Sequence, residues 1–162
     1  MNRPMRELFA RRLAELARKD NKIILLTGDL GYSFFELFAK EVPDRFINCG
    51  VIEQSMVGIA CGLADMGWKP WVYSASTFLI FRACEQVRND VCYGNRNVKL
   101  VGFAGKSYMF LGYSHLPKNK EEIKKLKLFP NIKIYEPKKE KEVEEMVKKA
   151  YQTKKPTYIR LL

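Results

Sequence analysis

A single carboxylate opens an otherwise apolar helical segment of the sequence. Residues 47–67 read INCGVIEQSMVGIACGLADMG, and Glu53 follows Gly50 at the start of the predicted helix. One interpretation is structural, because a carboxylate near the free N–H groups of a helix N-terminus contributes about 0.3–1 kcal/mol. Gly58 and Gly62, however, give this helix a surface suited to very close packing. Close packing would bury Glu53, and a buried carboxyl group can share or donate a proton near neutral pH.

Two further candidates for chemistry lie in predicted loops. His115 is the single histidine of the chain and has Gly, Tyr and Ser as its loop neighbours. Loop residues at the rim of an α/β fold often carry function. Asp29 follows an apolar run, but it is equally compatible with a turn position in the sequence GDLG.

Two aromatic side chains and an ion pair share one predicted helix. Phe78 and Phe81 are three residues apart and therefore fall on one helix face, where packing in the core is their default role. Arg82 and Glu85 have the same spacing, which predicts a surface ion pair of little energetic weight.

Strands and helices alternate along the predicted chain. Apolar runs predict strands at residues 22–28, 45–49, 70–74, 98–104, 132–137 and 157–162. Helical spacing predicts helices at residues 3–19, 33–41, 52–66, 77–91, 119–127 and 139–152, with Ser33 as the N-cap of the second. This alternation is typical of an α/β fold, a mostly parallel sheet of about six strands with helices on both faces, in one domain over residues 1–162.

The candidate residues should meet at one edge of this sheet. Parallel α/β sheets bind ligands beyond the carboxyl ends of their strands. Asp29, Glu53, residues 77–82 and His115 all lie at or just after a predicted strand end. We therefore expect them to converge on a single rim.

The net charge of +11 has an explanation that needs no nucleic acid. Lysines in KNKEEIKKLKLF and in residues 136–155 alternate with glutamates at helical spacing, which describes solvated helix faces. A phosphate-bearing small substrate is another sufficient reason for positive charge. Because no zinc-finger, RNP or basic-zipper signature occurs, a nucleic-acid-binding role is not favoured.

Absent motifs exclude several other classes of protein. The sequence lacks GxGxxG, GxxxxGK[ST] and GxSxG, which mark dinucleotide, nucleoside triphosphate and acyl-nucleophile sites. Four cysteines without a CxxC pair and one histidine do not support a zinc site. No apolar run reaches the ~20 residues that span a membrane, and the cysteine usage fits a reducing cytoplasm.

Several blocks of the sequence, in order, resemble the pyrimidine-binding domain of transketolases and their relatives, which are thiamine-diphosphate enzymes. The resemblance runs from about Arg6 to Leu162. It implies the thiamine-diphosphate-binding fold and the transfer of a two-carbon ketol unit from a ketose or ketose phosphate to an aldehyde acceptor. The blocks are PDRFINCGVIEQSMVGIACGLADMGWKP, STFLIFRACEQVRNDV, GYSH, FPNIKIYEP and PTYIRLL.

The resemblance also implies a role for each candidate residue. Glu53 matches the glutamate that hydrogen-bonds the aminopyrimidine ring of the cofactor, which favours the imino tautomer that removes the proton from the thiazolium carbon. His115 matches a histidine close to that carbon and to the substrate. The other matches are cofactor contacts at Phe78, Phe81 and Asp29 and sugar-phosphate contacts near Arg6 and Ser33.

A partner subunit follows from the same resemblance. The family's metal-diphosphate motif, Gly-Asp-Gly followed by Asn, belongs to a different domain, and TGDLG does not match it. We therefore expect one module of a split transketolase, part of a heterotetramer. The partner would hold Mg²⁺ and the diphosphate, and this chain would bind no metal.

Two departures from the family pattern leave the substrate open. Leu111 stands where transketolases have an Asp that recognises a donor hydroxyl, and Phe103 lies near the position of a phosphate-binding histidine. A site that lacks the polar partner for a substrate hydroxyl or phosphate disfavours substrates that carry this group. The alternatives are a deoxyxylulose-phosphate-synthase-like or 2-oxo-acid carboligase subunit, and a non-catalytic remnant that scaffolds a partner.

Overall fold

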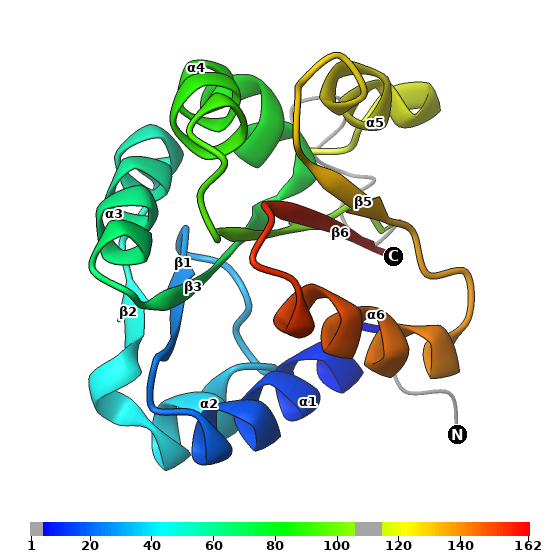
Figure 1. Cartoon of the computed structure of the whole chain (residues 1–162). Coiled ribbons are helices and arrows are strands. Elements are labelled where there is room, and N and C mark those ends of the chain that lie inside the picture. Colours follow the sequence, from blue (N-terminus) through cyan, green and yellow to red (C-terminus); the bar gives the residue numbers. More distant parts are fainter. Residues whose placement is uncertain (1–4, 106–114) are drawn as a thin grey trace.

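A six-stranded parallel sheet runs through the centre of the structure, a computed structural model that describes residues 5–105 and 115–162 (Figure 1). The strand order is β2-β1-β3-β4-β6-β5, and each neighbouring pair is parallel. The predicted fold class is therefore confirmed. The strands are β1 (Ile23–Thr27), β2 (Phe46–Asn48), β3 (Lys69–Ala75), β4 (Lys99–Phe103), β5 (Lys133–Tyr135) and β6 (Thr157–Leu161).

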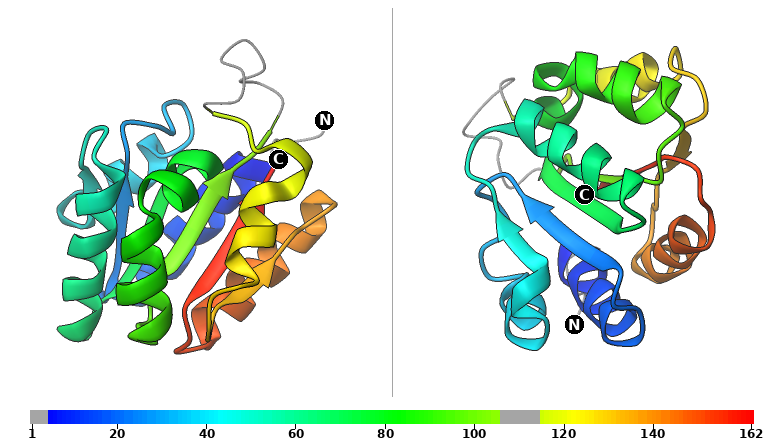
Figure 2. Two further views of the ribbon diagram at one scale, coloured as in Figure 1. Left: turned by 90° about the horizontal axis from the view of Figure 1, so that it is seen from above. Right: turned by 60° about the vertical axis from the view of Figure 1, so that its left-hand side comes forward.

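Helices cover both faces of the sheet (Figure 2). One face carries α1 (Met5–Lys19), α2 (Glu36–Glu41) and α6 (Glu140–Gln152). The other face carries α3 (Glu53–Asp65), α4 (Cys84–Gln86) and α5 (Glu121–Leu126). Short 3₁₀ turns, η1 (Pro43–Arg45) and η5 (Lys118–Lys120), precede β2 and α5. Among the described residues, no helix is long and apolar enough to cross a membrane.

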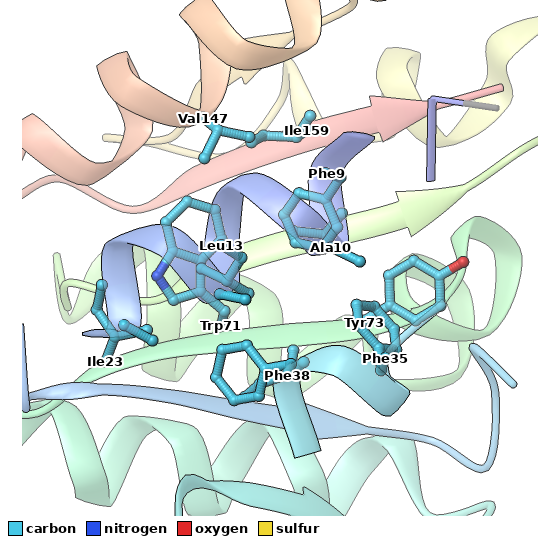
Figure 3. Close-up of a cluster of buried hydrophobic side chains, with 14 of the residues drawn as sticks. Phe9, Ala10, Leu13, Ile23, Phe35, Phe38, Trp71, Tyr73, Val147 and Ile159 are labelled. Carbon is cyan, nitrogen blue, oxygen red and sulfur yellow. The ribbon is translucent and has the colours of Figure 1, made fainter. Parts of the chain in front are cut away.

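An aromatic core lies between the sheet and α1, α2 and α6 (Figure 3). Phe9 of α1 packs against Phe35, Trp71 and Tyr73, with ring centroids 6.1, 5.9 and 6.3 Å away. Phe9 begins a stripe at helical spacing that continues through Leu13 and buries one side of α1. This packing fixes α1 and the start of α2 against β3.

A buried lysine is the first residue of β4, an inner strand of the sheet. Lys99 is only 1% exposed, and its Nζ donates to the carbonyl oxygens of Thr153 and Lys155 at 2.8 and 2.9 Å. Burial disfavours the charged ammonium, and the charges of Lys133 and Lys69 add to this effect. Together they lower the pKa of Lys99 to about 7.

The segment predicted as one α-helix over residues 77–91 is less regular than expected. It consists of the π-helical η2 (Phe78–Arg82), the short α4 and the π-helical η3 (Val87–Tyr93). In a π-turn the hydrogen bond spans five residues, as from the Ala83 N–H to the Phe78 oxygen at 3.3 Å. The wider turn changes which side chains share a face, and this affects the site described below.

The prediction that Ser33 caps the second helix is wrong. The N-cap position of α2 is Phe35, and no side chain caps the helix. Ser33 lies in a turn with a φ of 68°, where its N–H donates to Oε1 of Glu36. Gly31 has a φ of 97° and passes so close to the Phe35 ring that a Cβ there would clash. Aromatic packing therefore sets the start of α2.

Candidate functional site

A pocket of about 230 Å³ opens at the carboxyl end of β1. Its walls come from the loop after β1, the start of α3, η2 and the segment before η5. The sequence predicted that residues from these segments would share one rim, and the structure brings four of the predicted site residues together there. The lining residues are Gly28, Asp29, Leu30, Val51, Glu53, Phe78, Arg82 and His115.

Glu53 places a buried carboxyl group in the wall of this pocket. It is the first residue of α3 and has no exposed surface. Ser74 Oγ donates to Oε1 of Glu53 at 2.8 Å, and Nη1 of Arg82 donates to Oε2 at 2.6 Å. Each carboxyl oxygen thus has one side-chain donor, which holds the group in a fixed orientation.

A glycine at the end of β1 makes room for this carboxyl group. A Cβ built on Gly28 would lie 3.2 Å from Oε1 of Glu53 and 3.2 Å from Oγ of Ser74. The Gly28 N–H also donates to the Tyr73 oxygen at 3.1 Å, which continues the pairing of β1 with β3. The close approach of the β1 end to Glu53 therefore depends on the missing side chain.

Arg82 does not form the surface pair with Glu85 that the helical spacing predicted. It forms an ion pair with Glu53 instead, and its side chain is 37% exposed while the Glu53 side chain is 0% exposed. The Arg82 guanidinium carbon also lies 4.0 Å from the centroid of the Phe78 ring. Arg82 is four residues after Phe78, so the two side chains share one face of this turn, and that face borders the pocket.

The two phenylalanines predicted to share a face diverge in the structure. Phe78 lines the pocket, and its ring meets the His115 ring edge-on with centroids 4.5 Å apart. Phe81 is 38% exposed, and Nζ of Lys125 lies over the Phe81 ring, 4.8 Å from the ring centroid. Phe81 is not among the lining residues of the pocket, so its stacking on a cofactor stays a prediction from the resemblance.

Asp29 is held in the pocket wall by Asn48 and Tyr32. The Asp29 N–H donates to Oδ1 of Asn48 at 3.0 Å, and Nδ2 of Asn48 donates back to Oδ1 of Asp29 at 3.0 Å. The Tyr32 hydroxyl donates to the same Asp29 oxygen at 2.5 Å. The hydrogen bond from Tyr32 and the one from Asn48 lower the pKa of Asp29. Asn48 also accepts from the Gly50 N–H at 3.0 Å, so one side chain ties the loop after β1 to the loop before α3.

The predicted phosphate contacts lie outside this pocket. The Arg6 guanidinium carbon lies 4.4 Å from the ring centroid of Phe34 and 3.9 Å from that of Phe103. Phe103 is buried and Ser33 is exposed. Leu111 lies outside the described residues. In the part of the chain that the structure describes, no group of three or more His, Cys, Asp or Glu side chains could hold a metal ion.

The side of α3 that faces away from the sheet is open, and small and apolar residues lie there beside the exposed Gln54 and Ser55. A Cβ built on Gly58 or Gly62 would have no heavy atom within 4 Å. Ile59 lies between them and is 46% exposed, and Val51 near the pocket is 60% exposed. The close packing that the sequence predicted for these glycines therefore does not occur within the described residues. We call this surface, formed by Val51, Ile52, Gly58, Ile59 and Gly62, the α3 outer face.

The roles of three residues in the site were not predicted from the sequence. Ser74 and Gly28 surround the Glu53 carboxyl group, and Asn48 connects the two loops. A signal was present for Ser74, because a serine inside the apolar run WVYSA needs a hydrogen-bond partner when it is buried. Asn48 carried no comparable signal, since its role depends on the pairing of β1 with β2.

Comparison with known proteins gives a consistent result. The transketolase pyrimidine-binding domain family matches residues 2–162. The chain is 37% identical over 158 residues to an apulose-4-phosphate transketolase subunit of Phocaeicola vulgatus, and the match covers 96% of this chain and 50% of that protein. It is 38% identical over 160 residues to the 1-deoxy-D-xylulose-5-phosphate synthase of Caldanaerobacter subterraneus, with 95% of this chain and 24% of that protein covered.

A solved structure shows the same fold. The protein described as "Split gene transketolase, inactive beta4 tetramer" superposes with a TM-score of 0.88 at 33% identity, over 99% of this chain and 52% of that chain. The chain thus spans about half the length of the apulose-4-phosphate transketolase subunit and of this solved structure.

Proposed function

Because the chain belongs to the transketolase pyrimidine-binding domain family, as its sequence blocks predicted, we propose that it forms the aminopyrimidine side of a thiamine-diphosphate site. The proposed reaction transfers a two-carbon ketol unit from a ketose or ketose phosphate to an aldehyde acceptor. The similarity to the apulose-4-phosphate transketolase subunit supports it. The observation that carries the proposal is Glu53, a carboxyl group with no exposed surface that borders a pocket.

The residues of the pocket fit an aminopyrimidine ring. Glu53 borders the cavity with an oriented carboxyl group, Gly28 leaves space beside it, and Phe78 provides an aromatic wall. Thiamine diphosphate, when bound, supplies the carbon that carries the ketol unit. Glu53 would share a proton with a ring nitrogen, while the hydrogen bond from Ser74 keeps the carboxyl group in position.

The other candidate residues have supporting roles in this proposal. His115 would bind substrate at the pocket edge, where its ring rests against Phe78. Asp29 would face the thiazolium side, held by Asn48. On the resemblance, we also propose stacking by Phe81 and sugar-phosphate contacts from Arg6 and Ser33.

We propose that a partner subunit completes the site in a heterotetramer. The partner would hold the diphosphate and Mg²⁺, as the family motif missing from this chain implies. The α3 outer face supports such a partner, because Gly58 and Gly62 permit close backbone approach and Val51 connects this face with the pocket. The four cysteines are free, which fits the expected cytoplasmic location.

Replacement of Glu53 tests the proposal. In the complex of this chain with its partner, Glu53→Gln should weaken thiamine-diphosphate binding and lower ketol transfer by about 10²–10⁴-fold, the usual contribution of a proton-transfer group. Glu85→Gln, at an exposed position of α4, is the matched control and should leave both unchanged. Full turnover in the Glu53 variant, with the chain folded, would contradict the assignment.

The second candidate function is that of a deoxyxylulose-phosphate-synthase-like or 2-oxo-acid carboligase subunit. Similarity to the synthase over nearly all of this chain favours it. The same pocket would then act on a 2-oxo acid and release carbon dioxide. Incubating the complex with pyruvate or with a ketose phosphate, and measuring carbon dioxide, separates the two candidates.

A further inference from the structure

Arg82 contacts Glu53 and Phe78, the two side chains that a bound aminopyrimidine would also contact. Its guanidinium donates to Oε2 of Glu53 at 2.6 Å and covers the Phe78 ring at 4.0 Å. A guanidinium is planar and carries N–H donors in its plane. An aminopyrimidine ring is also planar, bonds a carboxyl group at its edge and stacks on aromatic faces. The side chain and the ring therefore compete for the same contacts.

Of the two Glu53 carboxyl oxygens, Oε2 is the one for which Arg82 and an aminopyrimidine ring would compete. Oε1 lies against the Gly28 backbone and accepts from Ser74, which is fully buried. Oε2 accepts from Arg82, and Arg82 lines the pocket. A ring that enters the pocket and bonds Oε2 competes for this oxygen with the guanidinium, which lies between Oε2 and the Phe78 ring.

We infer that Arg82 is a placeholder that occupies the aminopyrimidine position in the cofactor-free protein and swings toward solvent when the cofactor enters. This inference rests on the proposed function. The side chain is 37% exposed, so its guanidinium can move into water by rotation about its own bonds. Arg82 is a positioning residue in this scheme, since it acts through Glu53.

Titration calorimetry of the complex with its partner tests this inference. Thiamine diphosphate is added with Mg²⁺, and its dissociation constant is measured. Arg82→Met keeps the aliphatic stem and removes the charge. It should bind the cofactor about two- to fivefold more tightly than wild type, because the exchange no longer breaks an ion pair.

Two variants control for other effects. Arg88→Met removes an exposed arginine on η3 that also lies over an aromatic ring, that of Tyr93 at 4.8 Å, and it should leave the affinity for thiamine diphosphate unchanged. Arg82→Lys keeps the charge without the planar fork and should fall between wild type and Arg82→Met. It also provides the test if the methionine variant does not fold.

The outcomes separate this inference from the proposed function. Wild-type binding of the cofactor that is weakened in Glu53→Gln, with equal or weaker binding in both Arg82 variants, overturns the placeholder and leaves the function intact. Absence of binding in wild type overturns both. Tighter binding in Arg82→Met, with Arg82→Lys between it and wild type, supports both.

Discussion

Replacing Lys99 with methionine should change the stability of the protein in a strongly pH-dependent way. Burial and the nearby lysines lower the pKa of Lys99 from 10.5 to about 7. Between these two values the unfolded chain binds a proton that the folded chain does not, so wild-type stability rises with pH by about 1.4 kcal/mol per unit. Methionine does not titrate. The unfolding free energy of Lys99→Met minus that of wild type should therefore fall by roughly 2.3 kcal/mol from pH 7 to pH 9, since the folded lysine is still half protonated at the lower pH.

Urea denaturation at pH 7, 8 and 9, followed by tryptophan fluorescence, measures this difference. Trp71 is a suitable probe because it is fully buried and pairs in register with Lys99 on the neighbouring strand. Lys148→Met, at an exposed position of α6, is the control and should give a difference that is nearly constant with pH. A constant difference for Lys99→Met would refute the reasoning. It would mean that the carbonyl oxygens of Thr153 and Lys155 keep the ammonium charged despite its burial.

Three further predictions concern the pocket and its surroundings. Gly28→Ala should weaken thiamine-diphosphate binding in calorimetry and lower stability by about 1 kcal/mol, since its Cβ would press on Oε1 of Glu53 at 3.2 Å. Asn48→Ala should raise the pKa of Asp29 toward its ordinary value, measured by NMR titration of the carboxyl carbon, while the Tyr32 hydrogen bond keeps the rise partial. Gly58→Leu should abolish association with the proposed partner subunit in analytical ultracentrifugation but leave the melting temperature of the free chain nearly unchanged, because a Cβ there meets nothing within 4 Å. Loss of folding in the last variant would contradict the assignment of an open face.

The arrangement of the fold could be predicted because apolar runs and helical spacings mark each element locally and alternate along the chain. The run KIILLTG is apolar and bounded by turn residues, and it forms β1 within one residue of either predicted end. The six strands end at one edge because parallel pairing requires it, so Asp29, Glu53 and His115 could be expected to meet. Burial of Glu53 could also be anticipated, although not which side chains would bond it.

The parts of the site that escaped prediction depend on backbone geometry beyond the ideal helix. The spacing of Phe78 and Phe81 indicates a shared face only if the helix is an α-helix, and the π-helical η2 separates them. Arg82 pairs with Glu53 of α3 rather than with Glu85, and spacing within one helix cannot indicate a contact between two elements. No residue type in the segment marks a π-turn in advance. The bonds of Asn48 likewise depend on loops that become neighbours only after β1 and β2 have paired.

The position of β6 has a consequence for how the protein is made. β6 lies inside the sheet, between β4 and β5, although residues 157–161 follow both in the chain. During synthesis, β2, β1, β3 and β4 can assemble first, and the free edge of β4 then has no partner until Leu161 has left the ribosome. An unpaired edge strand can join other nascent chains. The yield of native protein in a cell should therefore depend on the delay between translation of β4 and arrival of β6, so a chaperone that shields this edge would raise it.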